Sequence, residues 1–296
     1  MTDLFNRDLS LKMGEVELNI QAIDPRLPDR PAPSLRVAFD VEKNTNRDPN
    51  RAFVTIHNLN PSNRAALQKG SDLITSSKKA KKLYEWQMTL SAGYVDSKEQ
   101  IFLGDILFAD SKRERSDWVT TIEAGDEERN YNSRFVSASF GPGTSLYSVL
   151  TFLVTELKIG YGDSFNKLTT PLRKVIAFKK GVAVQGRVSE LLDKYVTTAG
   201  YQWSIQDGVL QVLAPNETTL ETIYVLSPST GLIGSPEKGE KGTVKAVSLL
   251  QGGIRPGRRI KIDSTMVKGT FKIERVIHHG DTWSKDWYTE VEAKPL

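Results

Sequence analysis

The sequence predicts a mainly β protein with an α+β insert. Short runs rich in β-branched and aromatic residues recur towards both ends of the chain, with turn residues between them. Helical periodicity is confined to two segments near the middle, and a strong hairpin signal follows the second. The chain has 296 residues, more than one domain usually holds. We therefore expect a first β domain at 1–140, a small mixed helix/hairpin domain at 141–220 and a second β domain at 221–296.

The first region consists of short strands interrupted by one small helix. Strands are predicted at 14–23, 35–42, 52–58, 84–92, 101–110 and 118–125. Asn60 and Pro61 open the helix, because Asn is a good N-cap and proline suits the first helical position. A strand, a helix of one or two turns and a returning pair of strands can close one end of a small β-barrel.

Two segments of this region are predicted to connect secondary-structure elements. Residues 24–33 contain four prolines, which exclude an interior strand or helix, so we expect a stiff connector there. Four lysines, Lys78, Lys79, Lys81 and Lys82, lie before the next strand. They predict a mobile solvated loop, with a patch that contacts phosphate or an acidic partner as the alternative.

The middle region predicts two amphipathic helices and a hairpin. Thr144 can cap the first helix, which ends at Gly160, and the second runs from about 188 to 199 before Gly200. The apolar stripes are Leu146, Val149, Leu150, Leu153, Val154 and Leu157 in the first helix, and Val188, Leu191, Leu192, Tyr195, Val196 and Ala199 in the second. Asp207-Gly208 then forms a two-residue turn between two strands. Helices this short are stable only when packed, so we expect them to cover a small sheet.

The last region returns to strands and concentrates positive charge. Strands are predicted at 245–251, 259–262, 269–280 and 287–293. The whole chain has a net charge of +4, yet residues 235–276 alone hold ten basic and four acidic residues. We predict that Arg255, Arg258, Arg259 and Lys261 meet an acidic neighbouring subunit. A nucleic-acid footprint is the alternative, but stacking aromatic residues are not interleaved with these cations.

Aromatic residues crowd the end of the chain. Trp283, Trp287 and Tyr288 lie close together around a predicted hairpin. Their spacing indicates closure of a barrel or a seam between subunits, and a platform for carbohydrate is the alternative. Trp283 and Trp287 therefore join the four cations as predicted interface residues.

The residues that usually carry catalysis are scarce or poorly arranged. The chain has no cysteine, which excludes disulfides, thiolate catalysis and cysteine-based zinc sites. His278 and His279 are adjacent on a predicted strand and point to opposite faces, so they cannot bind one metal together. The phosphate-loop-like stretch at 234–241 has Glu240 where the lysine belongs, and the acidic run at 126–128 is typical of a solvated turn. We expect no enzymatic activity, no metal site and no cofactor.

Targeting signals are also absent from the sequence. The N-terminus lacks the basic start and apolar core of a signal peptide. The longest apolar candidate, 146–159, is shorter than a membrane-spanning helix and contains two charged residues. We expect a protein kept in the cytosol, or in a particle assembled there, without a membrane anchor.

Several of these patterns follow one another in a recognisable order. They are I-x-N-L-x-x-x-N-R-x-x-L at 56–67, A-G-Y at 92–94 and I-F-x-G-D-I at 101–106, followed by 191–201, the hairpin at 203–210, and the segments at 226–236 and 254–257. In this order and spacing the chain resembles the hub proteins of baseplates in long-tailed bacteriophages. The similarity spans most of the chain.

The resemblance implies a structural role in a virion. Such hubs contain two β-barrel domains related to the tail-tube protein and a smaller mixed domain, and form homotrimers between a six-fold tube and a three-fold spike or tip. It implies the tail tube protein, a spike or tip protein and the tape-measure protein as partners, with DNA only passing through the channel. The alternatives are a module that binds or cleaves cell-wall peptidoglycan and the spike-type hub of a contractile injection system.

Overall fold

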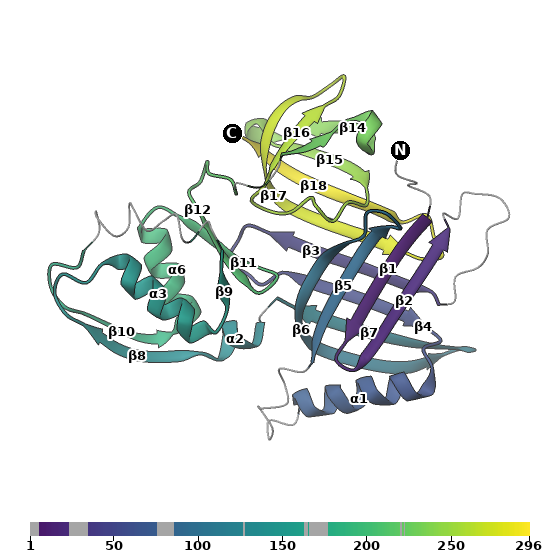
Figure 1. The fold of residues 1–296 in the computed structure, drawn as a ribbon, viewed down its shortest axis with the longest axis horizontal. Helices are drawn as coiled ribbons and strands as arrows, with labels where there is room; N and C mark the ends of the chain where they lie inside the picture. Colours follow the sequence, from purple (N-terminus) through teal and green to yellow (C-terminus); the bar gives the residue numbers. More distant parts are fainter. Residues whose placement is uncertain are drawn as a thin grey trace. The chain divides into compact units, whose positions relative to one another are not determined.

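The computed structural model describes residues 6–23, 35–75, 86–126, 128–162, 165, 177–219, 221 and 223–296. The proline-rich connector predicted at 24–33 and the lysine loop predicted at 78–82 lie outside these residues. The chain divides into two units (Figure 1). Unit 1 comprises Met1–Asn44, Asn50–Gly125 and Thr222–Leu296, and unit 2 comprises Thr45–Pro49 and Asp126–Glu221.

Unit 1 is built on one large sheet. Its strands are β1 (Asn6–Met13), β2 (Val16–Ile23), β3 (Val37–Asn44), β4 (Arg51–His57), β5 (Gln87–Tyr94), β6 (Glu99–Glu114), β7 (Asp117–Gly125), β13 (Tyr224–Leu226), β14 (Leu232–Lys238), β15 (Val244–Leu249), β16 (Arg259–Asp263), β17 (Lys268–Asp281) and β18 (Trp287–Pro295). The order across the sheet is β14-β15-β18-β17-β3-β4-β7-β6-β5-β1-β2, and β16 joins β17 to β13. Among the strand pairs in the described residues of this unit, only β13 with β16 is parallel.

The sheet is continuous across the two β regions that the sequence places in separate barrels. The join is the antiparallel pair of β3 and β17, in which Asp40 lies opposite His279. The outermost strands, β14 and β2, do not pair with each other in the described residues. The protein is therefore mainly β with one large antiparallel sheet, and barrel closure is not seen within the described part of the chain.

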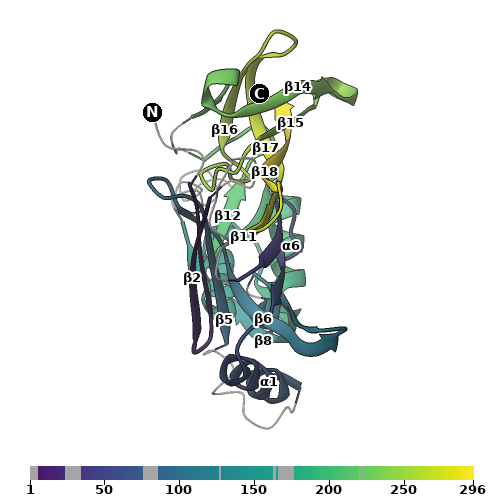
Figure 2. The same cartoon turned by 90° about the vertical axis from the view of Figure 1, so that its right-hand side faces the viewer.

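The helix α1 (Pro61–Thr75) is longer than the one or two turns expected. Its start is as predicted, because the Asn63 N–H donates a hydrogen bond to Asn60 Oδ1 at 2.8 Å. Figures 1 and 2 show α1 lying across one end of the neighbouring strands. A Cβ at Gly70 would lie only 2.2 Å from the Trp86 ring, so glycine lets the helix pack closely there. This packing explains a length that the local sequence does not indicate.

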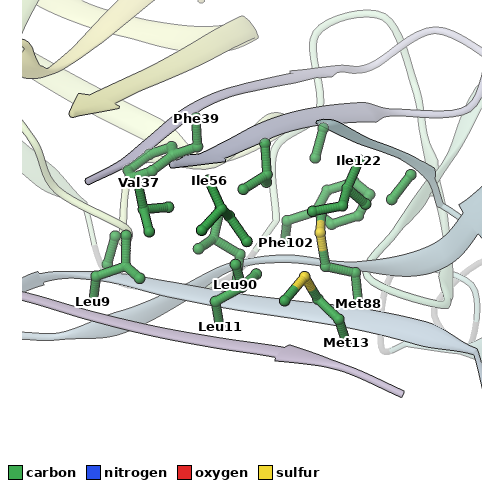
Figure 3. Packing of buried hydrophobic residues seen from close by; sticks show 14 of the residues in the cluster. Leu9, Leu11, Met13, Val37, Phe39, Ile56, Met88, Leu90, Phe102 and Ile122 are labelled. Atoms are coloured by element: carbon green, nitrogen blue, oxygen red, sulfur yellow. The ribbon is translucent and has the colours of Figure 1, made fainter. Parts of the chain in front are cut away.

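Alternating inward side chains build the core of unit 1. Figure 3 shows residues from several strands converging, among them Leu9 and Leu11 on β1, Phe39 on β3 and Leu90 on β5. All four are at most 2% exposed. Removing one such side chain typically costs about 2–5 kcal/mol of stability.

Unit 2 combines helices with two small sheets. Its elements are α2 (Glu128–Ser133), β8 (Phe135–Phe140), α3 (Leu146–Leu157), β9 (Gly160–Tyr161), β10 (Val182–Arg187), α6 (Val188–Thr198), β11 (Gln202–Gln206) and β12 (Val209–Leu213). The sheets are β10-β8 and β11-β12-β9. The apolar stripes predicted for α3 and α6 face a common core with both sheets. The predicted turn is confirmed, because Asp207 and Gly208 both have positive φ, 53° and 78°.

The ends of α3 differ from the prediction. The N-cap is Ser145, whose Oγ accepts a hydrogen bond from the Ser148 N–H at 3.1 Å, and not Thr144. The Thr144 hydroxyl instead donates to the Gly141 carbonyl at 2.8 Å. The helix stops at Leu157 because Lys158 adopts a left-handed conformation, before Gly160 is reached.

Candidate interaction surfaces

Arg255 and Arg258, two of the predicted interface cations, form hydrogen bonds that hold the loop between β15 and β16. Arg255 Nη2 donates to the Gln100 carbonyl at 2.9 Å, and its Nε donates to the Gly252 carbonyl at 3.2 Å. Arg258 Nη1 donates to the Gly253 carbonyl at 2.9 Å. Both guanidinium groups therefore hold backbone within unit 1.

The other two predicted cations lie on β16. Arg259 is half-buried, and its Nε is a buried donor without a hydrogen-bond partner in the described residues. Lys261 lies two residues further along and is exposed. The structure thus brings all four cations to one region of unit 1, but of the four only Lys261 is exposed.

Much of the remaining positive charge near the C-terminus is paired locally. Lys245 Nζ lies 2.9 Å from Glu292 Oε1, and Arg275 lies 2.7 Å from Glu42 and 3.6 Å from Glu292. Lys272 is fully buried. Exposed pairs of this kind contribute about 0–1 kcal/mol each, but they neutralise the surface that carries them. The exposed cations that remain include Lys238, Lys241 and Lys261.

The two predicted tryptophans have different surroundings. Trp283 is 48% exposed in the turn between β17 and β18, whereas Trp287 is 3% exposed. Trp287 Nε1 donates to the Gly93 carbonyl at 3.2 Å, and its ring meets Phe39 edge-on at 5.5 Å. Trp287 thus ties β18 to β5 and β3 in the core of unit 1.

A polar cluster beside Trp283 was missed by the sequence analysis. The Arg36 guanidinium donates to Asp281 Oδ2 at 2.8 Å, and Arg7 Nη1 donates to the Asp281 and Ser284 carbonyls at 3.0 and 2.6 Å. Burial pushes the pKa of Asp281 up, but the hydrogen bonds from Arg36 and from the Trp283 N–H outweigh it, so the pKa is lowered. These partners are more than 240 positions apart in sequence, and no local pattern links them.

The two adjacent histidines point to opposite faces, as predicted. His278 is buried, with Nδ1 2.9 Å from Thr289 Oγ1. Burial, with the nearby charges of Lys43 and Arg255, lowers the pKa of His278 to about 3. His279 lies on the other face against the Asp40 carboxylate, with Tyr288 4.8 Å away between ring centroids. The His278 and Thr289 side chains are both buried, so this pair does not face solvent.

The acidic run at 126–128 has a structural role in its first residue. The Asp126 carboxylate accepts the backbone N–H groups of Asp207 and Gly208 at 2.7 and 2.9 Å. Asp126 is buried, contrary to the expected solvated turn, because it fixes the hairpin tip. Glu127 lies outside the described residues. The described residues contain no group of three or more histidine or acidic side chains suited to a metal ion.

None of the helices in the described residues is both long and apolar enough to span a bilayer. β2 and β14 are the outermost strands of the large sheet in the part of the chain that the structure describes. The edge of β2 carries exposed Glu17, with Glu15 in the turn before it, whereas the edge of β14 carries exposed Lys238. Open edges present unpaired backbone groups that another strand can satisfy.

The chain is similar to a known protein family and to several solved structures. A family model described as "Baseplate hub gp41" matches residues 22–293. No curated protein sequence matches the chain. Among solved structures, the 43 kDa tail protein of prophage MuSo2 from Shewanella oneidensis matches with a TM-score of 0.63 at 7% identity, covering 98% of this chain and 97% of that chain.

Two further solved structures share the fold. The tail protein from Neisseria meningitidis MC58 matches with a TM-score of 0.61 at 9% identity, over 98% of this chain and 97% of that chain. The E. coli c3393 protein is described as a component of the type VI secretion system with structural similarity to the T4 bacteriophage tail proteins gp27 and gp5. It matches with a TM-score of 0.56 at 10% identity, over 97% of this chain and 76% of that chain. At these identities the similarity shows a common fold.

Proposed function

Since the chain belongs to the baseplate hub gp41 family, we propose that it is the structural hub of a phage tail baseplate, a homotrimer that adapts the six-fold tail tube to a three-fold spike or tip. The observation that carries this proposal is the single sheet that spans both β regions and ends in two open edges. If each β region is one tube-like domain, three chains present six similar units. The presence of two similar β domains in each chain then resolves the mismatch between the six-fold tube and the three-fold spike or tip.

The trimer seam joins the β14 edge of one protomer to the β2 edge of the next. A head-to-tail contact of this kind closes a ring, whereas a two-fold contact would stop at a dimer. Glu17 on one edge and Lys238 on the other supply an opposite-charge pair, whereas the exposed Glu237, Lys238, Glu240 and Lys241 together have no net charge. The barrels close between protomers in this arrangement, which agrees with the absence of closure within the described part of one chain.

The six predicted interface residues divide into two roles in this proposal. Lys261 and Trp283 are exposed and touch a neighbouring subunit. Arg255, Arg258 and Trp287 hold the loops and strands that present those contacts, and Arg259 is half-buried beside them. Reversing the charge of Arg258 and Arg259 would therefore disturb folding as well as assembly.

The hub acts mechanically and in assembly, without turnover and without a cofactor. Its partners are the tail tube protein, the spike or tip protein and the tape-measure protein, and DNA only passes through the channel. It is a part of the virion, made and assembled in the host cytoplasm. We also propose three domains, 1–140, 141–220 and 221–296.

The mass of the purified chain in solution tests this function. Native mass spectrometry should give three times the 33.0 kDa of one chain, and negative-stain images of the particle should place the trimer at the tube end. A chain that stays monomeric at micromolar concentration and is missing from purified tails would refute the proposal.

A further inference from the structure

In the described part of unit 2, the strand β8 pairs with another strand on one side only. That partner is β10, and these two strands form a sheet of their own. The helices α3 and α6 pack on one face of this sheet (Figure 1). Within the described residues no strand covers the second edge of β8.

The hydrogen-bond register identifies the backbone groups on that edge. The Val188 N–H donates to the Arg134 carbonyl at 3.0 Å, and the Phe178 N–H donates to the Thr144 carbonyl at 3.0 Å. Both pairs continue the register in which Ala138 lies opposite Val184. Hydrogen-bonded pairs alternate with non-bonded pairs in an antiparallel ladder. The backbone of Ala138 therefore forms hydrogen bonds with β10, whereas Ser137 and Ser139 direct their backbone N–H and C=O groups away from β10.

This edge lacks the features that usually prevent strand pairing. β8 reads Phe-Val-Ser-Ala-Ser-Phe, without a charge, a proline or a glycine. β10, the other edge of the same sheet, contrasts with it, because its sequence contains Gly186 and Arg187. Native proteins commonly protect exposed edges with such residues, so an unprotected edge indicates a covered one.

The core beside the edge is also incompletely covered. Val136, Ala138 and Phe140 face the apolar core of unit 2 but are only partly buried. Val184, opposite Ala138 on β10, is 1% exposed. An incoming strand with apolar residues at alternate positions would complete this burial.

One end of the edge favours an acidic residue. Arg187 lies opposite Phe135, with its guanidinium carbon 5.6 Å from the ring centre. Its Nε is buried and has no hydrogen-bond partner in the described residues. Glu190 lies 3.6 Å from Nη1, and the Arg187 side chain remains 39% exposed, so the guanidinium group can also bind an incoming carboxylate. Phe135 itself is 67% exposed and offers an apolar contact nearby.

We propose that β8 binds, by strand addition, an extended segment of another tail protein. This segment has apolar residues at alternate positions and an acidic side chain that reaches Arg187. Main-chain hydrogen bonds supply affinity, and the alternate side chains supply specificity. The inference rests on the proposed function for the source of the segment, but it assigns unit 2 a contact separate from the trimer seam.

Two proline variants provide a matched test. Ser137→Pro removes an outward N–H from β8, and Gln185→Pro removes the outward N–H of the residue directly opposite on β10. Neither change removes a hydrogen bond between the two strands, and proline is tolerated on the solvent side of an edge strand. Both purified chains should keep the circular dichroism spectrum and melting temperature of the natural chain.

Amide hydrogen exchange of residues 134–141 is measured in the isolated chain and in baseplates purified from the phage that encodes it. We expect exchange at least about tenfold slower in the baseplate. Particles with Ser137→Pro should lose this protection together with one tail protein, and particles with Gln185→Pro should keep both. The chain has no cysteine, so Ser139→Cys gives a unique cross-linking position to identify that protein.

The other possible outcomes distinguish a failure of the strand-addition proposal from a failure of the proposed hub function. If the hub is present in the baseplate but residues 134–141 exchange as fast as in the isolated chain, strand addition is wrong and the hub function stands. If the isolated chain already protects this edge in a concentration-dependent way, a second copy is the occupant and the proposed partner is wrong. If the chain is missing from the particle, both proposals fail.

Discussion

Acid should destabilise unit 1 through a single buried histidine. His278 is 1% exposed, and its pKa in the folded chain is about 3 against an ordinary value of 6.5. Between these values the unfolded chain binds a proton at His278 and the folded chain does not. Unfolding therefore takes up a proton in this window, and the free energy of unfolding falls as the pH falls below about 6.5. Above that pH the histidine contributes no pH dependence.

The expected size follows from proton linkage. Well inside the window each pH unit lowers the free energy of unfolding by about 1.4 kcal/mol, and acidification from pH 6.5, where the unfolded histidine is half protonated, to pH 4.5 lowers it by roughly 2.3 kcal/mol from this group alone. Urea unfolding at pH 7.0, 5.5 and 4.5, followed by tryptophan fluorescence, measures the total loss. The same series on His278→Asn isolates the contribution of the histidine, because asparagine keeps a polar atom near the Thr289 hydroxyl but does not titrate.

A second variant separates the effect of histidine protonation on stability from the effect of losing the hydrogen bond to Thr289. Thr289→Val removes the hydroxyl 2.9 Å from His278 Nδ1 and leaves the histidine in place. It should lower stability at every pH and keep the natural dependence on pH. The reasoning is refuted if the natural chain and His278→Asn lose stability in parallel between pH 6.5 and 4.5.

Three further changes test the core of unit 2, the seam and the absence of catalysis. Leu192→Asp places a charge in a fully buried position of α6 and should destabilise unit 2 by several kcal/mol in thermal melts, whereas Lys194→Asp on the exposed side should change stability by less than about 0.5 kcal/mol. Lys238→Glu should weaken the trimer in native mass spectrometry while leaving the melting temperature of the monomer unchanged, and Lys69→Glu, an exposed charge reversal on α1, should not weaken it. The natural trimer should also weaken in high salt, since exposed charges are screened over about 8 Å at physiological ionic strength. The purified chain should not lyse peptidoglycan, and lysis that His279→Ala abolishes would contradict this.

Local signals predicted the elements whose residues stabilise one another within a few positions. The stripe around Leu192, the turn at Asp207-Gly208 and the cap at Asn60 depend on neighbours in sequence, and the structure confirms all three. β8 and β10 were not predicted, because the alternation of Ser137 and Ser139 with small apolar residues is too weak to distinguish from a loop.

The candidate surfaces were predicted less completely because they depend on pairing between distant strands. Trp287 is a core residue only once β18 lies near β5 and β3, and the sequence around it gives no sign of that pairing. Arg7 and Asp281 meet for the same reason. Charge counts identify the basic segment, but they could not show that Glu42 would neutralise Arg275 from the opposite half of the chain.

The pairing of β3 with β17 also affects how the chain is made. About 240 residues separate the two strands, so at ordinary rates of translation β3 leaves the ribosome roughly 10 to 50 s before its partner. During that time one side of β3 has no strand to pair with, and an open edge of this kind recruits other chains. Asp40 and Glu42 place charges along this strand, which makes aggregation of the nascent chain less favourable. Most of unit 2 is continuous in sequence, from Asp126 to Glu221, and its core is complete before β17 is synthesised. The order of synthesis thus favours folding of unit 2 first, with the large sheet completed only when the last strands emerge.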